Sequence, residues 1–367
     1  MSSNSVAAVE VRNLSKHYGT VVALNKVSIS IAAGEYFVLL GPSGGGKTTL
    51  LRTIGGFHKP TGGDVLLHGE NVGHLPPDKR PTSMVFQSYA LFPHMTVMGN
   101  VGYGLSLSKR SKEEIKEKSE HMLEMVGLSG YGDRKPHELS GGQQQRVQLA
   151  RSLVLDRDIL LLDEPLAALD AKLRKDMCYE LKHLQEKVGI TFIHVTHNQE
   201  EAMTVADRIA LIAEGNLIEC ADARAMYEAP DNRFTASFIG DNNLLDGTVS
   251  DITGDNVKIA IGDQQITVNR RGLDVERGQS ATVSIRSELT EMSERATTNA
   301  NGVNELLGSF REATYLGLTT SNVAALETGE ELVSRVVSTD SMHIPDVDTP
   351  VILSWQADAA RLHTRGA

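Results

Sequence analysis

A glycine-rich segment that ends in lysine and threonine is the strongest chemical signal in this sequence. Its members are Gly41, Pro42, Ser43, Gly44, Gly45, Gly46, Lys47 and Thr48, followed directly by Thr49. The spacing fits the phosphate-loop pattern GxxxxGK[ST], with an apolar run before it and a helix-like run after it. Glycines let backbone N–H groups curl around phosphate oxygens, and a helix start adds a positive dipole. We therefore expect a nucleotide here, with Lys47 at its β and γ phosphates and the Thr48 hydroxyl on Mg²⁺. The alternative is a glycine-rich turn with an unrelated lysine, which the surrounding runs disfavour.

Two adjacent carboxylates are the second signal. Asp163 and Glu164 directly follow the apolar residues 159–162, so we expect them at the end of a buried strand. Beside a phosphate loop, Asp163 suits Mg²⁺ binding through water, and Glu164 suits orienting and deprotonating an attacking water. An apolar run that ends in Asp-Glu is also common as a plain strand end. The pairing with the phosphate loop is what favours a functional role.

The third signal is a serine followed by two glycines and a glutamine, namely Ser140, Gly141, Gly142 and Gln143. Serine is a favoured helix N-cap, and the N–H groups of a helix start attract anions. The alternative is a simple capped helix. Because the chain already contains one phosphate site, a second anion-binding helix start suggests a nucleotide sandwiched between two copies of the chain.

Short apolar runs alternate with longer segments of helical period as far as residue 240. Residues 36–40, 159–162, 191–195 and 209–212 resemble strands buried on both faces, and residues 112–126 have helical period. This pattern predicts a parallel α/β domain over residues 1–240. Residues 241–367 hold short alternating segments separated by Gly, Asn and Asp, which predict a small all-β barrel or sandwich.

Composition narrows the classes of partner. The net charge is −11, and residues 241–367 hold 10 Lys and Arg against 19 Asp and Glu. Neither half therefore has the basic footprint of a nucleic-acid-binding protein. The two cysteines, Cys178 and Cys220, have no metal-type spacing, and we expect them to be reduced. No run approaches the ~18 apolar residues of a membrane span.

The three motifs, which occur within residues 6–240 in the chain order 41–48, 140–143 and 163–164, resemble those of the ATP-binding subunits of ABC transporters. The resemblance implies three further site residues. Tyr18 would stack on adenine, Gln87 would reach Mg²⁺ and the attacking water, and His197 would lie near the γ-phosphate. It also implies that Glu164 is the catalytic base of the reaction ATP + H₂O → ADP + phosphate.

Assembly follows from the same resemblance. Residues 140–143 would contact ATP held by a second subunit, and Asp170 lies in the loop that would cross the dimer interface. The implied complex is a homodimer with two transmembrane permease subunits and, indirectly, a solute-binding protein. Such a subunit would be peripheral, on the cytoplasmic face of the inner membrane.

The predicted fold class is an α/β P-loop core with a helical subdomain over about residues 88–158, followed by an all-β accessory domain. Residues 238–244 and 283–286 resemble the entrance and core of the OB-like domain on some importer ATPases. Ser287 stands where a proline is usual. An OB-like barrel often binds oligonucleotides, but the negative charge of this region argues against that use.

The stretch of residues 76–97, with Lys79, Arg80 and Pro81, most resembles the spermidine/putrescine importer ATPases. Ferric-iron and sugar or glycerol-phosphate importer ATPases are the alternatives within the family. Three rivals remain outside importers: a soluble ABC ATPase of DNA repair or translation, a binding-only module whose ATPase has decayed, and an exporter ATPase. Intact Lys47, Asp163, Glu164 and His197 oppose the decayed module, and the β extension opposes the exporter.

Overall fold

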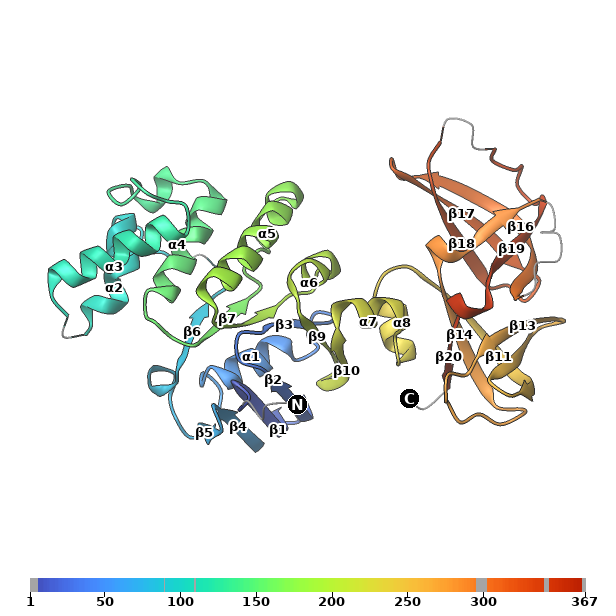
Figure 1. The fold of residues 1–367 in the computed structure, drawn as a ribbon, viewed down its shortest axis with the longest axis horizontal. Coiled ribbons are helices and arrows are strands. Elements are labelled where there is room, and N and C mark those ends of the chain that lie inside the picture. Colours follow the sequence, from blue (N-terminus) through green and yellow to red (C-terminus); the bar gives the residue numbers. More distant parts are fainter. Residues whose placement is uncertain (1–5, 89, 109, 295–301, 340–342, 365–367) are drawn as a thin grey trace. The chain divides into compact units, whose positions relative to one another are not determined.

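The computed structural model describes residues 6–88, 90–108, 110–294, 302–339 and 343–364. Tyr89, within the stretch singled out above, lies outside the described residues. The chain divides into two compact units, Met1–Ala223 and Arg224–Ala367, and each is described by itself (Figure 1). The predicted order of an α/β core followed by an all-β region is confirmed.

A six-stranded sheet forms the centre of the first unit. Its strands, in spatial order, are β10 (Asn216–Asp222), β9 (Arg208–Ala213), β3 (Tyr36–Leu40), β8 (Thr191–Val195), β7 (Ile159–Asp163) and β6 (Thr82–Val85). All neighbours pair in parallel except β10, which is antiparallel to β9. Strands β3, β7 and β8 are buried along their whole length, because both faces of the sheet are covered. Their continuous apolar runs made them predictable.

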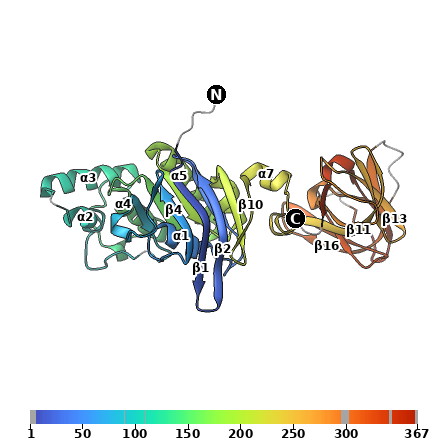
Figure 2. The same cartoon turned by 90° about the horizontal axis from the view of Figure 1, so that it is seen from below.

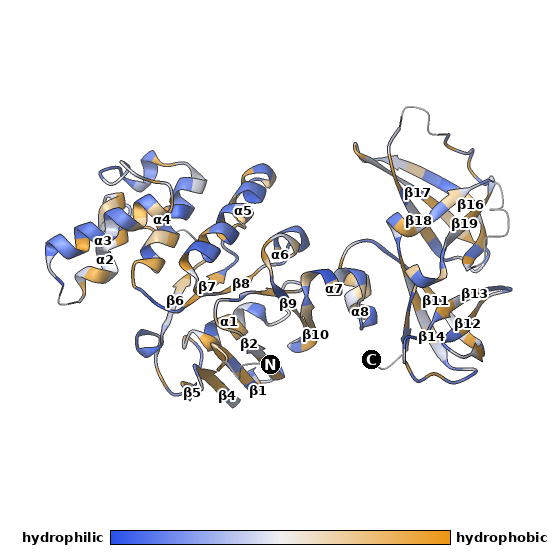
Figure 3. Cartoon of the chain, in the orientation of Figure 1, coloured by the Kyte–Doolittle hydropathy of each residue, from blue (hydrophilic) through white to orange (hydrophobic). Residues whose placement is uncertain are grey.

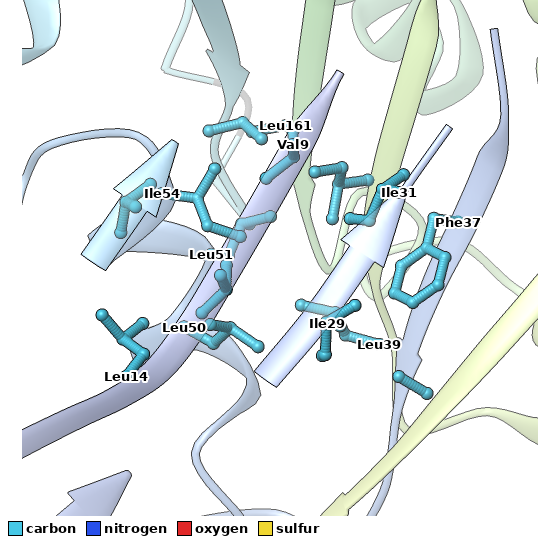
Figure 4. Packing of buried hydrophobic residues seen from close by; sticks show 14 of the residues in the cluster. Val9, Leu14, Ile29, Ile31, Phe37, Leu39, Leu50, Leu51, Ile54 and Leu161 are labelled. Atoms are coloured by element: carbon cyan, nitrogen blue, oxygen red, sulfur yellow. The ribbon is translucent and has the colours of Figure 1, made fainter. Parts of the chain in front are cut away.

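A second, antiparallel sheet covers the helix that follows the glycine-rich loop. It contains β2 (Val21–Ile31), β1 (Val9–Tyr18), β4 (Gly62–Leu67) and β5 (Glu70–Asn71). Helix α1 (Lys47–Ile54) places Leu50, Leu51 and Ile54 in a core with residues of both sheets, including Val9 and Leu161 (Figure 4). The glycine-rich loop is therefore anchored on both sides by packed apolar surface.

Helices complete the first unit. Their bounds are α2 (Val97–Ser106), α3 (Lys112–Met125), α4 (Gly141–Leu153), α5 (Ala171–Val188) and α6 (Gln199–Val205), with short 3₁₀ turns at Pro77–Lys79 and Pro136–Glu138. Helices α2, α3 and α4 contact one another and gather at one end of the unit (Figure 2). They form the expected helical subdomain. Helix α5 is mostly hydrophilic in colour (Figure 3) and buries one side only.

The second unit is built from two five-stranded antiparallel sheets around one apolar core. One contains β13 (Gln264–Asn269), β12 (Asn256–Ile261), β11 (Asn242–Thr253), β14 (Ser280–Arg286) and β20 (Arg361–Thr364). The other contains β15 (Glu291–Ser293), β19 (Pro350–Gln356), β16 (Val303–Tyr315), β17 (Thr319–Leu326) and β18 (Glu331–Val337). Two 3₁₀ turns lie at Ser287–Leu289 and Ala357–Ala359.

Two short helices, α7 (Ala223–Glu228) and α8 (Arg233–Phe238), precede these sheets. The buried Arg286 guanidinium donates to the backbone carbonyls of Tyr227 and Ile239, and Arg233 Nε donates to Thr282 Oγ1 at 3.0 Å. These bonds attach the two helices to the β sheets. The sequence predicts the end of the ATP-binding domain at residue 240, and that boundary stays a prediction. The first compact unit of the structure ends at Ala223.

Among the described residues, no helix combines the length and the apolar character needed to cross a bilayer. Cys178 is buried, Cys220 is half-buried, and both are free thiols.

Candidate functional site

The glycine-rich loop connects the carboxyl end of β3 to the start of α1. Gly41 and Gly46 have φ of +147° and +108°, and a Cβ added to either would lie 2.0 Å from Ile212 O or 2.6 Å from Ala23 O. Only glycine fits at these two positions. The loop consequently presents backbone rather than side chains to whatever it encloses.

Lys47 lies under this loop. Its Nζ donates to the carbonyls of Gly41 and Pro42, at 2.8 Å each. Burial lowers the pKa of Lys47, while the nearby charges of Glu164 and Asp163 oppose that change. The ammonium group is thus held inside the curve of the loop, as a phosphate-binding lysine would need to be.

Asp163, the last residue of β7, faces the first turn of α1. Its Oδ1 accepts a hydrogen bond of 2.9 Å from Thr48 Oγ1, and its Oδ2 accepts one of 3.2 Å from Arg52 Nη2. The carboxylate is buried. Sequence reasoning missed Arg52, although its spacing of four from Thr48 puts both residues on one helix face. That spacing is the signal that would have found it.

Glu164 has an unusual backbone and two polar neighbours. Its φ is +47°, and its N–H donates to Val195 O at 3.0 Å. Gln87 Nε2 donates to Glu164 Oε2 at 3.1 Å, and His197 Nδ1 lies 3.4 Å from Oε1. A left-handed φ is costly for a residue with a Cβ, so the surrounding structure must hold this carboxylate in place.

Parallel strands explain why these residues meet. Gly41, Gln87, Glu164 and His197 follow the carboxyl ends of β3, β6, β7 and β8, which are neighbours in one sheet. The carboxyl ends of parallel strands lie at one edge, where ligands of α/β proteins bind. The structure therefore brings together Lys47 and Thr48 with Asp163, and Gln87 and His197 with Glu164, from segments far apart in the sequence.

A buried polar network lies behind His197 and was not expected from the sequence. Thr196 Oγ1 donates to Glu201 Oε2 at 2.6 Å, and Arg174 Nε lies 3.4 Å from Glu201 Oε1. Arg174 Nη2 also donates to Leu169 O at 2.8 Å. Burial raises the pKa of Glu201, while the Thr196 hydrogen bond lowers it. The network ties the segment before α5 to the segment that carries His197.

Three other expected positions have different local surroundings. Tyr18, at the end of β1, is 45% exposed, with its ring edge-on to His58. Ser140 is the N-cap of α4 and forms a capping box with Gln143. Asp170 is the N-cap of α5, where Oδ1 accepts from Leu173 N at 3.0 Å. Among the described residues, no hydrogen bond joins these three to residues 41–48.

Comparison with known proteins gives consistent matches along the chain. An ABC transporter family profile matches residues 24–167, and a TOBE domain profile matches residues 283–362. The spermidine/putrescine import ATP-binding protein PotA of Nitrosomonas eutropha is 44% identical over 358 residues, covering 97% of this chain and 98% of that protein. The protein of the same name from Roseobacter denitrificans is 46% identical over 342 residues, covering 93% of each.

Solved structures match about three fifths of the chain. A dimeric ATP-binding cassette, MJ0796, in a post-hydrolysis state with ADP and Pi, has a TM-score of 0.53 at 34% identity, covering 59% of this chain and 99% of that one. The cbiO1 protein of Clostridium perfringens, part of the ABC transporter complex cbiONQ, has a TM-score of 0.56 at 29% identity. It covers 59% of this chain and 89% of its own.

Proposed function

Because this chain belongs to the ATP-binding subunits of ABC transporters, we propose that its ATP hydrolysis drives the import of a polyamine such as spermidine or putrescine. The observation that carries the proposal is the 44% identity to a spermidine/putrescine import ATP-binding protein over 97% of this chain and 98% of that protein. That match includes the β unit as well as the ATP-binding unit. A shared ATPase domain alone would not account for similarity that extends through the β unit.

We propose that ATP binds with its β and γ phosphates in the glycine-rich loop. Lys47 is already buried beneath that loop, with its ammonium group directed at two loop carbonyls. Phosphate oxygens would replace those carbonyls as acceptors, and the gain in charge interaction would favour the exchange. Tyr18, exposed at the end of β1, would contact the adenine ring.

Oxygen ligands for Mg²⁺ are available beside the loop. Thr48 Oγ1 and Asp163 Oδ1 lie 2.9 Å apart, and a hydroxyl plus one carboxylate, completed by water and phosphate oxygens, is the ligand set that Mg²⁺ prefers. The ion would neutralise charge on the phosphates. Arg52, which holds the other Asp163 oxygen, would keep the carboxylate oriented toward Thr48.

Hydrolysis is assigned to the cluster around Glu164. Its carboxylate would accept a proton from the attacking water, which then forms a bond to the γ-phosphorus while the bond to ADP breaks. Gln87 and His197 lie within 3.4 Å of this carboxylate. They would orient the water and the γ-phosphate, and Glu164 would return the proton to the phosphate product or to solvent.

Residues 140–143 and Asp170 are assigned to a second copy of the chain. Ser140 caps the start of α4 and, among the described residues, has no hydrogen bond to the glycine-rich loop, so the N–H groups of this helix start would face ATP held by the partner. The resulting homodimer would act with two permease subunits, and indirectly with a solute-binding protein, as a peripheral subunit at the cytoplasmic face of the membrane.

Transport by cells tests this proposal. A strain in which the gene is deleted should lose uptake of labelled spermidine or putrescine, and a plasmid copy should restore it. A plasmid copy with Lys47→Ala should not, because the charge facing the phosphates is gone. Normal polyamine uptake by the deletion strain, with loss of ferric-iron or sugar uptake instead, would move the assignment to one of those importers.

A further inference from the structure

One face of helix α4 holds the loop that carries Gln87. Gln148, Arg151 and Ser152 are spaced three and four apart on α4 and so share a face. Their side chains donate to the backbone carbonyls of residues 84–90: Ser152 Oγ to Met84 O at 3.4 Å, Gln148 Nε2 to Phe86 O at 2.9 Å and Ser88 O at 3.1 Å, and Arg151 Nη1 to Ala90 O at 2.8 Å. The accepting carbonyls belong to Met84 in β6 and to Phe86, Ser88 and Ala90 after it, and β6 contacts α4 (Figure 1).

Gln148 is the central member of this row. Its two hydrogen bonds go to the residues immediately before and after Gln87. The side chain is 1% exposed, and its Oε1 has no hydrogen-bond partner within the part of the chain that the structure describes. A buried oxygen without a partner costs free energy. Stability alone would therefore favour an apolar side chain here, whereas an amide is needed to hold both carbonyls.

We propose that Gln148 is a positioning residue that sets Gln87 against Glu164. Fixing the carbonyls on both sides of Gln87 restricts its backbone, so that its Nε2 stays within 3.1 Å of Glu164 Oε2. The inference rests on the proposed function, because it concerns the assigned hydrolysis site. It adds a residue outside the phosphate-loop, carboxylate and signature motifs.

The same contact links two ends of one rigid element. Helix α4 begins at Gly141 with Ser140 as its N-cap, and Gln148 lies two turns further along. A shift of the Gln87 loop would therefore move the helix start assigned to the partner's ATP, and the reverse. Of the α4 side chains that bond to this segment, Gln148 is the one that bonds on both sides of Gln87.

The test compares Gln148→Met with Gln145→Met. Gln145 lies on the same helix and is equally buried, but its Nε2 has no hydrogen-bond partner among the described residues. Methionine preserves length and removes the donor. We expect Gln148→Met to lower kcat for ATP hydrolysis about 10-fold, as small misplacements of a positioned group do, with KM for ATP unchanged. Gln145→Met should match wild type in both constants.

A double-mutant cycle distinguishes an effect that acts through Gln87 from a general disruption of the ATP-binding unit. In a Gln87→Ala background, adding Gln148→Met should change kcat by less than about twofold, because the group being positioned is absent. Losses that multiply in the double variant, or a wild-type kcat in Gln148→Met, would overturn the proposal.

Hydrogen–deuterium exchange tests the anchoring independently of hydrolysis. Amides of residues 86–88 should exchange faster in full-length Gln148→Met than in Gln145→Met or wild type. Equal exchange in all three proteins would overturn the anchoring role. If exchange rises in Gln148→Met but wild type hydrolyses no ATP, the anchor stands and the proposed function fails.

Discussion

At the residue scale, Glu164 is assigned the role of catalytic base and also has a left-handed backbone conformation. Its carboxylate lies between Gln87 and His197, and its φ is +47°. Nothing in its own local sequence favours that conformation. The hydrogen bond from its N–H to Val195 O and the strand before it impose the conformation.

Glu164→Gln should separate ATP binding from hydrolysis. Glutamine keeps the size and one acceptor oxygen but loses the charge and the basicity. Removal of a positioned base typically lowers a rate by ~10²–10⁴-fold. We expect that loss in phosphate release, together with an ATP-bound dimer on size-exclusion chromatography with Mg²⁺. Glu200→Gln, on the exposed side of α6, is the matched control and should behave as wild type. A Glu164→Gln variant with undiminished turnover would show that another group is the base.

A second residue-scale prediction concerns His194, which is fully buried on β8 with Nδ1 3.1 Å from the Tyr36 hydroxyl. Burial lowers its pKa from 6.5 to about 3. The unfolded chain binds a proton below pH 6.5 that the folded chain refuses until about pH 3. Stability of the first unit should therefore fall as pH drops through that window, by ~1.4 kcal/mol per pH unit for one proton.

His194→Asn removes this titration while keeping a polar partner for Tyr36. Amide hydrogen exchange in β8 reports the first unit, whereas Trp355, the single tryptophan, reports the second. Exchange-derived stability between pH 6.5 and 4 should depend less steeply on pH in His194→Asn than in wild type. Parallel pH profiles for the two proteins would argue that His194 is protonated inside the fold.

At the element scale, Arg80 caps the C-terminal end of α1, the helix that follows the glycine-rich loop. It is almost completely buried, and its guanidinium donates to Thr53 O at 2.8 Å, Ile54 O at 2.7 Å and Leu75 O at 3.0 Å. The last carbonyls of a helix have no partner within it and carry partial negative charge. The sequence presented Arg80 only as a mark of resemblance. Its contacts explain why a buried cation is tolerated there.

Arg80→Met should destabilise the first unit. The change removes the guanidinium from the carbonyls of Ile54 and Leu75 and leaves Thr53 O with only the N–H of Gly56, and we expect a loss of about 2–4 kcal/mol in the free energy of unfolding. Lys79→Met, next to it and exposed, should change stability by no more than about 0.5 kcal/mol. Chemical denaturation followed by exchange at α1 amides measures both. Equal stabilities for the two variants would mean that water or another donor replaces the guanidinium.

Elements differ in how well the sequence predicted them. Strands β3, β7 and β8 were predicted because both of their faces are buried, which leaves a continuous apolar run. The sheet of β1, β2, β4 and β5 was not singled out, because its strands mix buried and exposed positions and contain register shifts. Helix α3 was predicted from its helical period, and the start of helix α4 was predicted from its capping serine, Ser140.

The site shows the same division between local and long-range information. Residues of the glycine-rich loop, Asp163 and Glu164 follow from local pattern and chemistry. Gln87 and His197 came only from the family resemblance, because a single glutamine or histidine has no local signature. Glu201 and Arg174 were missed altogether, since their pairing depends on how α5 and α6 pack.

At the scale of the whole molecule, the chemistry assigned to ATP lies in one of the two units. All the residues proposed to bind or hydrolyse ATP precede Ala223, where the first compact unit ends. The β unit has its own apolar core. Each unit thus has the apolar core of its own that a domain needs to fold separately.

A chain of residues 1–240 should bind ATP with wild-type affinity. Helices α7 and α8 would lose their hydrogen-bond partners in the β unit, so they should unfold without affecting the glycine-rich loop. Titration with a fluorescent ATP analogue measures the affinity, and a chain of residues 1–223 is the control that should match it. A soluble 1–240 protein that fails to bind ATP would show that the β unit is needed to form the site.

The left-handed backbone at Glu164 also has a consequence for how this sequence can vary. Glycine is the residue that such a φ favours, and the conformation costs a residue with a Cβ ~1 kcal/mol or more. A library randomised at this position and sorted only for abundance of folded protein should therefore enrich glycine. The same library sorted by growth on an imported nutrient should return glutamate. If the first selection enriches glycine and the second enriches glutamate, then function, and not the stability of the fold, determines which residue occupies this position.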